Sequence, residues 1–153
     1  MRLLFFLFLA LWPLILTSIF FLMSLNTNTV GRGGGSAAVQ TGITASTTAT
    51  QAGGLTVPLI AGVNNVTVSV ADDDAVSLPQ AVQGAIVIVK NSDAGSDIEV
   101  WPFTGDKINA GTLNAADTTK IGQTTGRMYV CVTSYTSSTA GDWISLGMPV
   151  PAV

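Results

Sequence analysis

The stretch from Gly84 to Asn109, GAIVIVKNSDAGSDIEVWPFTGDKIN, decides the fold class, because apolar runs alternate in it with polar turn residues. Ala85 to Val89 form a first run rich in branched aliphatic residues, a composition typical of strands. A polar cluster from Asn91 to Asp97 follows, and a second apolar run from Ile98 to Trp101 ends at Pro102. This order predicts a β-hairpin whose loop has about five to seven residues.

The residues from Leu55 onwards continue this pattern of short apolar runs separated by turns. Leu55 to Leu59 is a candidate edge strand, because Pro58 has no N–H to donate to a β-ladder. Apolar and polar residues alternate strictly from Asn65 to Val70. This alternation predicts a half-buried strand whose inward residues are Val66, Val68 and Val70.

Three further strands are expected in the second half of the chain. Ala85 to Val89 shows no alternation, so we expect a central strand covered on both faces. Arg127 to Ser134 predicts a two-faced strand, and Trp143 to Leu146 predicts the last one. The two faces of the former carry Met128, Val130 and Val132 on one side and Tyr129, Cys131 and Thr133 on the other. Helical periodicity is weak after Met23, and Ala110 to Asp117 would form one helical turn at most.

These elements predict an all-β domain over residues 55–153, with six to eight strands separated by turns. The expected architecture is an antiparallel β-sandwich, jelly-roll-like or otherwise Greek key. A domain of this size buries a modest fraction of its surface, so self-association would stabilise it. We therefore expect a homo-oligomer, with a slight preference for a trimer over a dimer.

Residues 1–23 are an apolar leader, and Leu3 to Met23 would make a helix of about 31 Å, which is long enough to cross a hydrocarbon core. One hypothesis is a retained membrane anchor, with Arg2 weakly favouring a cytoplasmic N-terminus. A second is a secretory signal, although no small-x-small cleavage site precedes Asn26. A third is that translation starts at Met23, which opens a polar sequence. A membrane association is expected only if the leader is retained.

Residues 24–54 are expected to form an arm or linker, because Gly31 to Gly54 consists mainly of Gly, Ser, Thr, Ala and Gln. Such a composition buries too little apolar surface to offset its ordering entropy, so alone it should be flexible. The simple interpretation is a tether. The alternative is an extended arm that becomes ordered against a neighbouring subunit.

Charge and composition exclude several classes of function. The formal net charge is −3 and the basic residues are scattered, which argues against a nucleic-acid partner. The chain has no His, the commonest general base and metal ligand. Its single Cys131 cannot form an internal disulfide. We expect no catalytic residues, no cofactor and no bound metal.

The acidic clusters of the chain are candidate cation sites. Asp72, Asp73 and Asp74 are adjacent and could supply oxygen ligands to Ca²⁺, but consecutive side chains on extended backbone point to opposite faces. A solvated turn is the better interpretation. The same holds for Asp93 and Asp97, which share one loop, and for Asp106. The segment Thr104-Gly105-Asp106-Lys107 lacks the second glycine and the Ser/Thr of a phosphate-binding loop, so it too is interpreted as a turn.

Aromatic residues and the cysteine have structural interpretations as well. Trp101, Phe103 and Trp143 could line a sugar-binding face, but a sandwich core also needs large aromatic side chains, and core packing is preferred. Cys131 lies mid-strand among apolar neighbours with no His to activate it. A buried, inert thiol is expected there.

Several pieces of the chain follow one another in a fixed order, and these are Ala81–Gly84, Val87–Asn91, Val100–Asn109, Met128–Cys131 and Gly141–Trp143. They form a pattern of a glycine, a strand ending in Asn, a turn, a strand ending in aromatic-Pro, then Gly-Asp and Ile-Asn, and finally a strand with a Cys and a Gly-x-Trp. This ordered combination resembles a pattern in small structural proteins of tailed bacteriophages. The apolar leader departs from the pattern, because such proteins assemble in the cytoplasm.

The resemblance implies a non-enzymatic virion component, such as a head-decoration, cement or fibre-like subunit on the particle surface. Its partners would be capsid or other virion proteins and further copies of itself. The alternative hypothesis is a membrane-anchored or secreted β-sandwich that binds carbohydrate or another surface ligand through Trp101 and Trp143.

Overall fold

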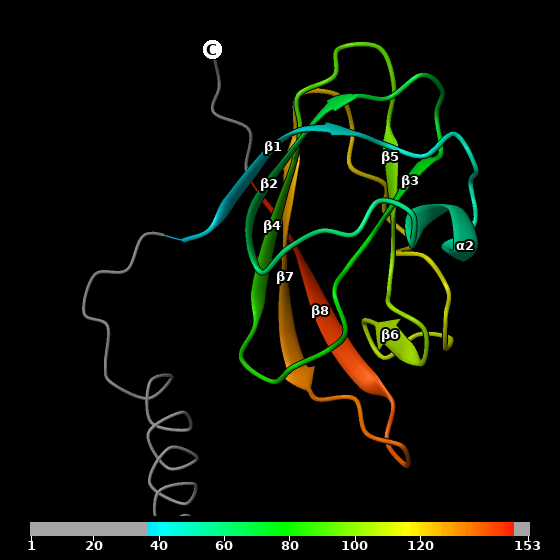
Figure 1. Ribbon diagram of the computed structural model, residues 1–153, viewed down its shortest axis with the longest axis vertical. Coiled ribbons are helices and arrows are strands. Elements are labelled where there is room, and N and C mark those ends of the chain that lie inside the picture. Colours follow the sequence, from blue (N-terminus) through cyan, green and yellow to red (C-terminus); the bar gives the residue numbers. More distant parts are fainter. Residues whose placement is uncertain (1–36, 149–153) are drawn as a thin grey trace, which may run out of the picture. The chain divides into compact units, whose positions relative to one another are not determined.

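A computed structural model describes residues 37–148, which fold into two β-sheets and one short helix (Figure 1). The elements are β1 (Val39–Thr44), α2 (Gln51–Gly54), β2 (Gly62–Val68), β3 (Asp74–Ser77), β4 (Ile86–Asn91), β5 (Ile98–Trp101), β6 (Asp106–Ile108), β7 (Gly126–Thr133) and β8 (Gly141–Gly147). The prediction of a mainly β domain with six to eight strands is therefore confirmed for this part of the chain.

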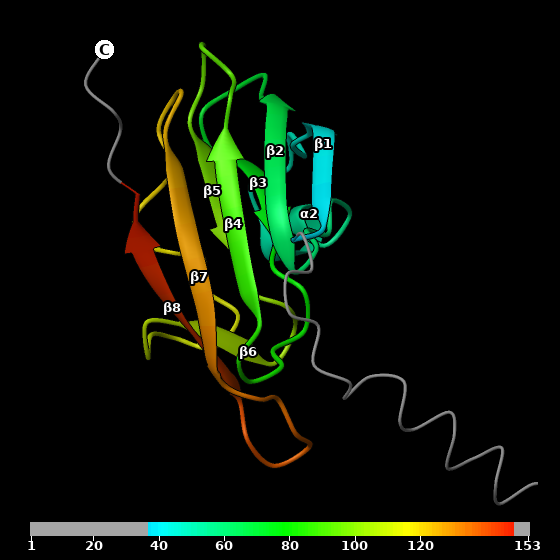
Figure 2. The ribbon, with the colours of Figure 1, turned by 90° about the vertical axis from the view of Figure 1, so that its left-hand side faces the viewer.

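Six strands form a mixed sheet in the order β1-β2-β4-β7-β8-β6, and β3 and β5 form a second sheet. The pairs β1–β2, β2–β4, β6–β8 and β3–β5 are parallel, whereas β4–β7 and β7–β8 are antiparallel. Figures 1 and 2 show the two sheets as separate layers, with β3, β5 and α2 on one side of the larger sheet. The expectation of an antiparallel sandwich is thus wrong in its strand directions.

The parallel pairs arise because the chain alternates between the layers. It runs through β2 in the large sheet, β3 in the small sheet, β4 beside β2, and β5 beside β3. Each return to a layer places a strand parallel to the one laid down before it. A hairpin connection would instead make neighbours antiparallel.

The predicted hairpin between β4 and β5 is wrong for the same reason. The polar cluster from Ser92 to Asp97 carries the chain from one layer to the other, rather than back along β4. The buried side chain of Asn91 holds this crossing: its Nδ2 donates to the carbonyls of Ser96 at 2.8 Å and Ile121 at 3.2 Å, and its Oδ1 accepts from the N–H of Asp93 at 3.0 Å. The polar turn residues are present as expected, but they connect strands of two different sheets instead of two neighbouring strands of one hairpin.

The core lies between the two layers. Val87 and Val89 from β4, Tyr129 and Cys131 from β7, and Trp143 from β8 are buried there against residues of β3 and β5. The two predicted faces of β7 and the position of β4 inside the sheet are confirmed. However, β4 is covered on one face only, because Ile86 and Lys90 are exposed and Ile88 is half-buried.

Two other strand predictions need correction. In β2 the buried residues are Asn64 and Val66, whereas Val68 and Val70, expected to point inward, are 42% and 70% exposed because the strand ends beyond the cover of the second layer. The candidate edge strand Leu55–Leu59 forms only an isolated bridge, in which Pro58 lies beside Ser77.

Residues 37–54, expected to belong to a flexible arm, are folded. β1 pairs with β2 in parallel, and α2 follows with Thr50 as its N-cap, whose Oγ1 accepts from the N–H of Gly53 at 3.2 Å. Pairing with β2 supplies backbone hydrogen bonds that the composition of the segment alone does not reveal. The one helical turn is therefore at Gln51–Gly54, and Ala110–Asp117 consists of turns and irregular backbone.

Residues 1–36 and 149–153 lie outside the described residues, so the expectations about the leader 1–23 and about residues 24–36 stay predictions. Within residues 37–148, no helix has the length and apolar character needed to span a bilayer.

Candidate functional site

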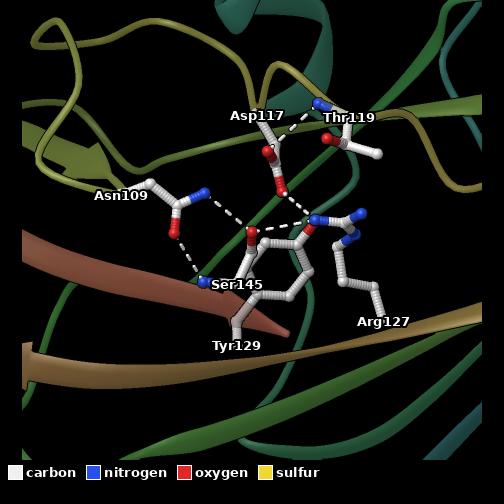
Figure 3. Close-up of polar contacts among 6 residues, drawn as sticks. All are labelled: Asn109, Asp117, Thr119, Arg127, Tyr129 and Ser145. Carbon is white, nitrogen blue, oxygen red and sulfur yellow. Dashed lines mark hydrogen bonds and ion pairs between the residues drawn. The ribbon is translucent and has the colours of Figure 1, made fainter. Parts of the chain in front are cut away.

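The densest side-chain network with a buried charge surrounds Asp117, in the connection between β6 and β7 (Figure 3). Its neighbours Arg127 and Tyr129 are two residues apart on β7, so both point to the inner face of the large sheet. The backbone N–H of Asp117 donates to the carbonyl of Val100 in β5 at 2.8 Å, which brings the carboxylate over that face.

The Asp117 carboxylate accepts three hydrogen bonds. Arg127 Nη1 and the Tyr129 hydroxyl donate to Oδ2 at 3.3 and 3.1 Å, and the N–H of Thr119 donates to Oδ1 at 3.2 Å. The Asp117 side chain is fully buried and that of Arg127 is 15% exposed. Burial raises the pKa of Tyr129 well above its ordinary value, and the neighbouring charge of Asp117 raises it further, so the phenol stays a proton donor.

A second set of contacts extends the network to β8. Arg127 Nη1 donates to Ser145 Oγ at 2.9 Å, and Asn109 Nδ2 donates to the same oxygen at 2.8 Å. The N–H of Ser145 donates back to Asn109 Oδ1 at 2.9 Å. Asn109 has a φ of 54°, a left-handed conformation that asparagine adopts more readily than most residues. Figure 3 shows Asn109 reaching β8 from the end of β6.

The network is built to hold structure rather than to move protons. The Asp117 carboxylate meets a permanent cation and a neutral phenol, and each polar group faces a partner of its own chain. Its effect is to fasten the long β6–β7 connection to β5, β7 and β8. The alternation of Arg127 and Tyr129 is visible in the sequence, but their partner Asp117 comes from a loop that has no periodic signal.

The acidic turn Asp72–Asp74 has three different uses in the structure. Asp72 Oδ1 accepts from the N–H of Asp97 at 3.0 Å, and Asp73 forms an ion pair with Lys120. Asp74 is buried, and its Oδ2 accepts from the N–H groups of Val70 at 2.6 Å and of Ala71 at 3.3 Å. The three carboxylates do not converge, as the turn interpretation expects.

Asp93 organises the loop that joins β4 to β5. Its carboxylate accepts from the N–H groups of Gly95 at 2.7 Å, Ser96 at 3.1 Å and Ser69 at 3.3 Å. These donors lower the pKa of Asp93, because they favour the charged carboxylate. Asp97 lies at the other end of the same loop and contributes its backbone to it. Both residues act in the turn.

Asp106, like Asp74, is buried. Its Oδ2 accepts from the N–H of Ala81 at 2.8 Å, and Oδ1 faces the backbone of Gly141. Burial raises the pKa of Asp106, and the bond from Ala81 opposes that shift. The next residue, Lys107, points to the other face of β6, and its Nζ lies 3.7 Å from Oδ2 of Asp142. The segment Thr104–Lys107 is a turn leading into β6, and its carboxylate is a structural acceptor.

The three aromatic candidates do not share a face. Trp143 is fully buried on the inner side of β8, as core packing predicts, so it cannot bind a sugar. Trp101 is half-buried on β5 in the other sheet, beside Gly54 of α2, and Phe103 is 37% exposed. A sugar-binding face formed jointly by Trp101 and Trp143 is therefore inconsistent with the structure.

Cys131 is buried on the inner face of β7, and its thiol lies 3.3 Å from the carbonyl of Thr133, to which it donates. Burial raises the pKa of Cys131, which keeps the sulfur protonated and weakly nucleophilic. Among residues 37–148, no three side chains of His, Cys, Asp or Glu are grouped as metal ligands would be.

Comparisons with known proteins add no relative: no family model, no curated protein and no solved structure matches this chain.

Proposed function

We propose that the protein is a structural subunit of a virus particle, of the capsid-decoration, cement or fibre type, which binds the particle surface and associates with copies of itself. The proposal rests on the resemblance to structural proteins of tailed bacteriophages and on what the resembling residues do in this fold.

The observation that carries the proposal is that these residues occupy framework positions. Asn91 holds the crossing between the sheets, Asp106 binds the backbone ahead of β4, and Trp143 fills the core. Gly84 has a φ of +84°, which side chains other than that of glycine rarely adopt. Gly141 packs against Ala81 and Asp106, where a Cβ would collide with both. The residues that carry the resemblance therefore maintain the fold.

Hydrogen-bonded aspartates outside the resembling residues also maintain the fold. Asp74, Asp93 and Asp117 each receive at least two hydrogen bonds from their own chain, and each fixes a loop relative to a strand. Loops held in this way keep a constant outline, which suits a subunit that must fit a repeated surface. A virion surface is accordingly the proposed location, and capsid or other virion proteins are the proposed partners.

Mass spectrometry of purified particles tests this proposal. We expect the protein at a fixed copy number per particle, retained through density-gradient purification and a high-salt wash. Recovery only in membranes of infected cells would overturn it. Peptides from residues 1–23 in the same data would show whether the leader is present in the mature protein.

A matched pair of variants sharpens the test. Gly141→Ala places a methyl group against Ala81 and Asp106, whereas Gly147→Ala on the same strand meets nothing within 4 Å. Particles made with Gly141→Ala should lose the protein, and those made with Gly147→Ala should retain it. If particles retained both variants equally, binding to the particle would not depend on the packing around Gly141.

A further inference from the structure

The large sheet has an outer face that the second layer does not cover. In Figure 2 this face is turned to the viewer, and β3, β5 and α2 lie behind the sheet. Two rows of paired residues cross it. Val39, Val63, Ile88, Met128 and Leu146 form one row through β1, β2, β4, β7 and β8. Ile86, Val130 and Ile144 form the second. We call these two rows, together with Val132, the outer face.

The outer face is apolar at its centre and charged only toward its ends. Lys90 lies at the C-terminal end of β4, and the pair Lys107–Asp142 lies at the opposite end of the sheet. The acidic turn Asp72–Asp74 and the Asp93–Asp97 loop belong to connections between the layers, away from the two rows. Leu146 and Ile86 remain 45% and 47% exposed. A contiguous patch of this kind marks an interaction surface.

Its composition indicates which partner it fits. The outward side chains of the two rows are aliphatic or methionine, without an aromatic residue or an arginine. Interfaces between different proteins are enriched in Trp, Tyr and Arg, and membrane-surface segments use aromatic and basic residues. Interfaces between identical subunits resemble a domain core cut in half, and the outer face has that character.

The size of the outer face is sufficient for such a contact. Neighbouring strands lie about 4.8 Å apart and outward residues on one strand about 6.7 Å apart, so the two rows span about 19 by 7 Å between Cα atoms, and Val132 extends the face to about 13 Å on β7 alone. With the side chains included, the footprint is about 400 Å² per copy, or about 800 Å² for two copies, which is the size of a weak, transient contact. We expect dissociation in the micromolar range.

We propose that the outer face binds the outer face of a second copy, forming a sheet-on-sheet pair related by a two-fold axis. The same patch on both partners gives a closed, two-fold contact, and stacked sheets pack about 10 Å apart with interdigitating side chains. The inference rests on the proposed function in that it identifies the self-association surface of the subunit. It differs from the slight sequence-based preference for a trimer.

Sedimentation velocity of the full chain over a range of concentrations tests the pairing. Leu146→Lys places a charge at the β8 end of the first row, and Leu113→Lys is its matched control, because Leu113 is 48% exposed in the β6–β7 connection. We expect a monomer–dimer equilibrium for the wild type and for Leu113→Lys. For Leu146→Lys we expect at least a tenfold weaker association at unchanged circular dichroism. The leader is identical in all three proteins, so any association that it drives would affect them equally.

Ile86→Lys, in the second row, provides an independent variant should Leu146→Lys fail to fold, and it should weaken association to the same extent. Equal association of all variants, a monomeric wild type at 100 μM, or a stoichiometry of three would each overturn the pairing. A monomeric wild type that is still found on particles would refute only the pairing. A dimer that is absent from particles would refute only the proposed function.

Discussion

Replacement of Asp117 by alanine tests whether the buried network holds the fold. The change removes the acceptor of Arg127, of the Tyr129 hydroxyl and of the Thr119 N–H. Removing one partner of a buried ion pair typically costs about 3–5 kcal/mol, and a phenol left unpartnered accounts for about 1–3 kcal/mol of such a loss. Arg127 keeps Ser145 and is 15% exposed, so the lower end applies. We expect Asp117→Ala to lower the free energy of unfolding by about 3 kcal/mol.

Urea denaturation of the full chain at pH 7, followed by tryptophan fluorescence, to which the buried Trp143 contributes, measures this loss. A loss of about 3 kcal/mol corresponds to a fall of about 10 °C in Tm for a body of this size. Tyr129→Phe removes one donor and should cost about 1 kcal/mol. In the double variant the two losses should not add, because both remove the same hydrogen bond.

Lys120→Ala is the control, because it breaks an ion pair with Asp73 in which both side chains are more than 40% exposed. Exposed pairs contribute about 0–1 kcal/mol, so this variant should unfold near the wild-type midpoint. A loss for Asp117→Ala that is no larger than the loss for Lys120→Ala would refute the structural role of the network. So would full additivity with Tyr129→Phe.

Three further predictions concern packing, the crossing loop and pH. Gly141→Ala should destabilise the protein by about 1–3 kcal/mol through overpacking, whereas Gly147→Ala should change its stability by less than about 0.5 kcal/mol, as measured by thermal denaturation. Asn91→Ala should cost about 2–3 kcal/mol in urea denaturation, because it leaves buried groups at both ends of the crossing unpartnered. The folded pKa of Tyr129 lies above its usual value of 10.0, so its contribution to stability is complete below pH 10 and is lost as the pH rises further. Tyr129→Phe should therefore show a smaller loss of stability than the wild type between pH 10 and 12.

The strands could be predicted from the sequence because their signal is local. Alternation of side chains identifies the faces of β7, and the branched run beginning at Ala85 identifies β4. Strand partners depend on the path of the chain, and turn residues do not encode that path. The cluster from Asn91 to Asp97 has the composition of a hairpin loop, yet it crosses between sheets, and Asn91 at its start donates to the carbonyl of Ser96 at its end and to that of Ile121 in the β6–β7 connection.

Residues whose structure depends on distant partners could not be predicted. β1 has the composition of a linker and becomes a strand through pairing with β2. Asp117 has no sequence feature that sets it apart from Asp93 or Asp97, and its importance comes from Arg127 and Tyr129, which approach it from another element. The long β6–β7 connection, rich in Thr and Ala, gives no periodicity from which such a contact could be inferred.

The run from Ala85 to Val89 connects the sequence with the proposed pairing. Its lack of alternation predicts burial on both faces, but within residues 37–148 only the face with Val87 and Val89 is covered. Ile86 and Ile88 lie on the outer face, in the two rows that we propose to pack against a second copy. Apolar residues on both faces of a strand indicate that both faces are buried, but they do not indicate whether the same chain buries both. If Ile86→Lys leaves the protein folded and weakens its self-association, the second cover is another subunit.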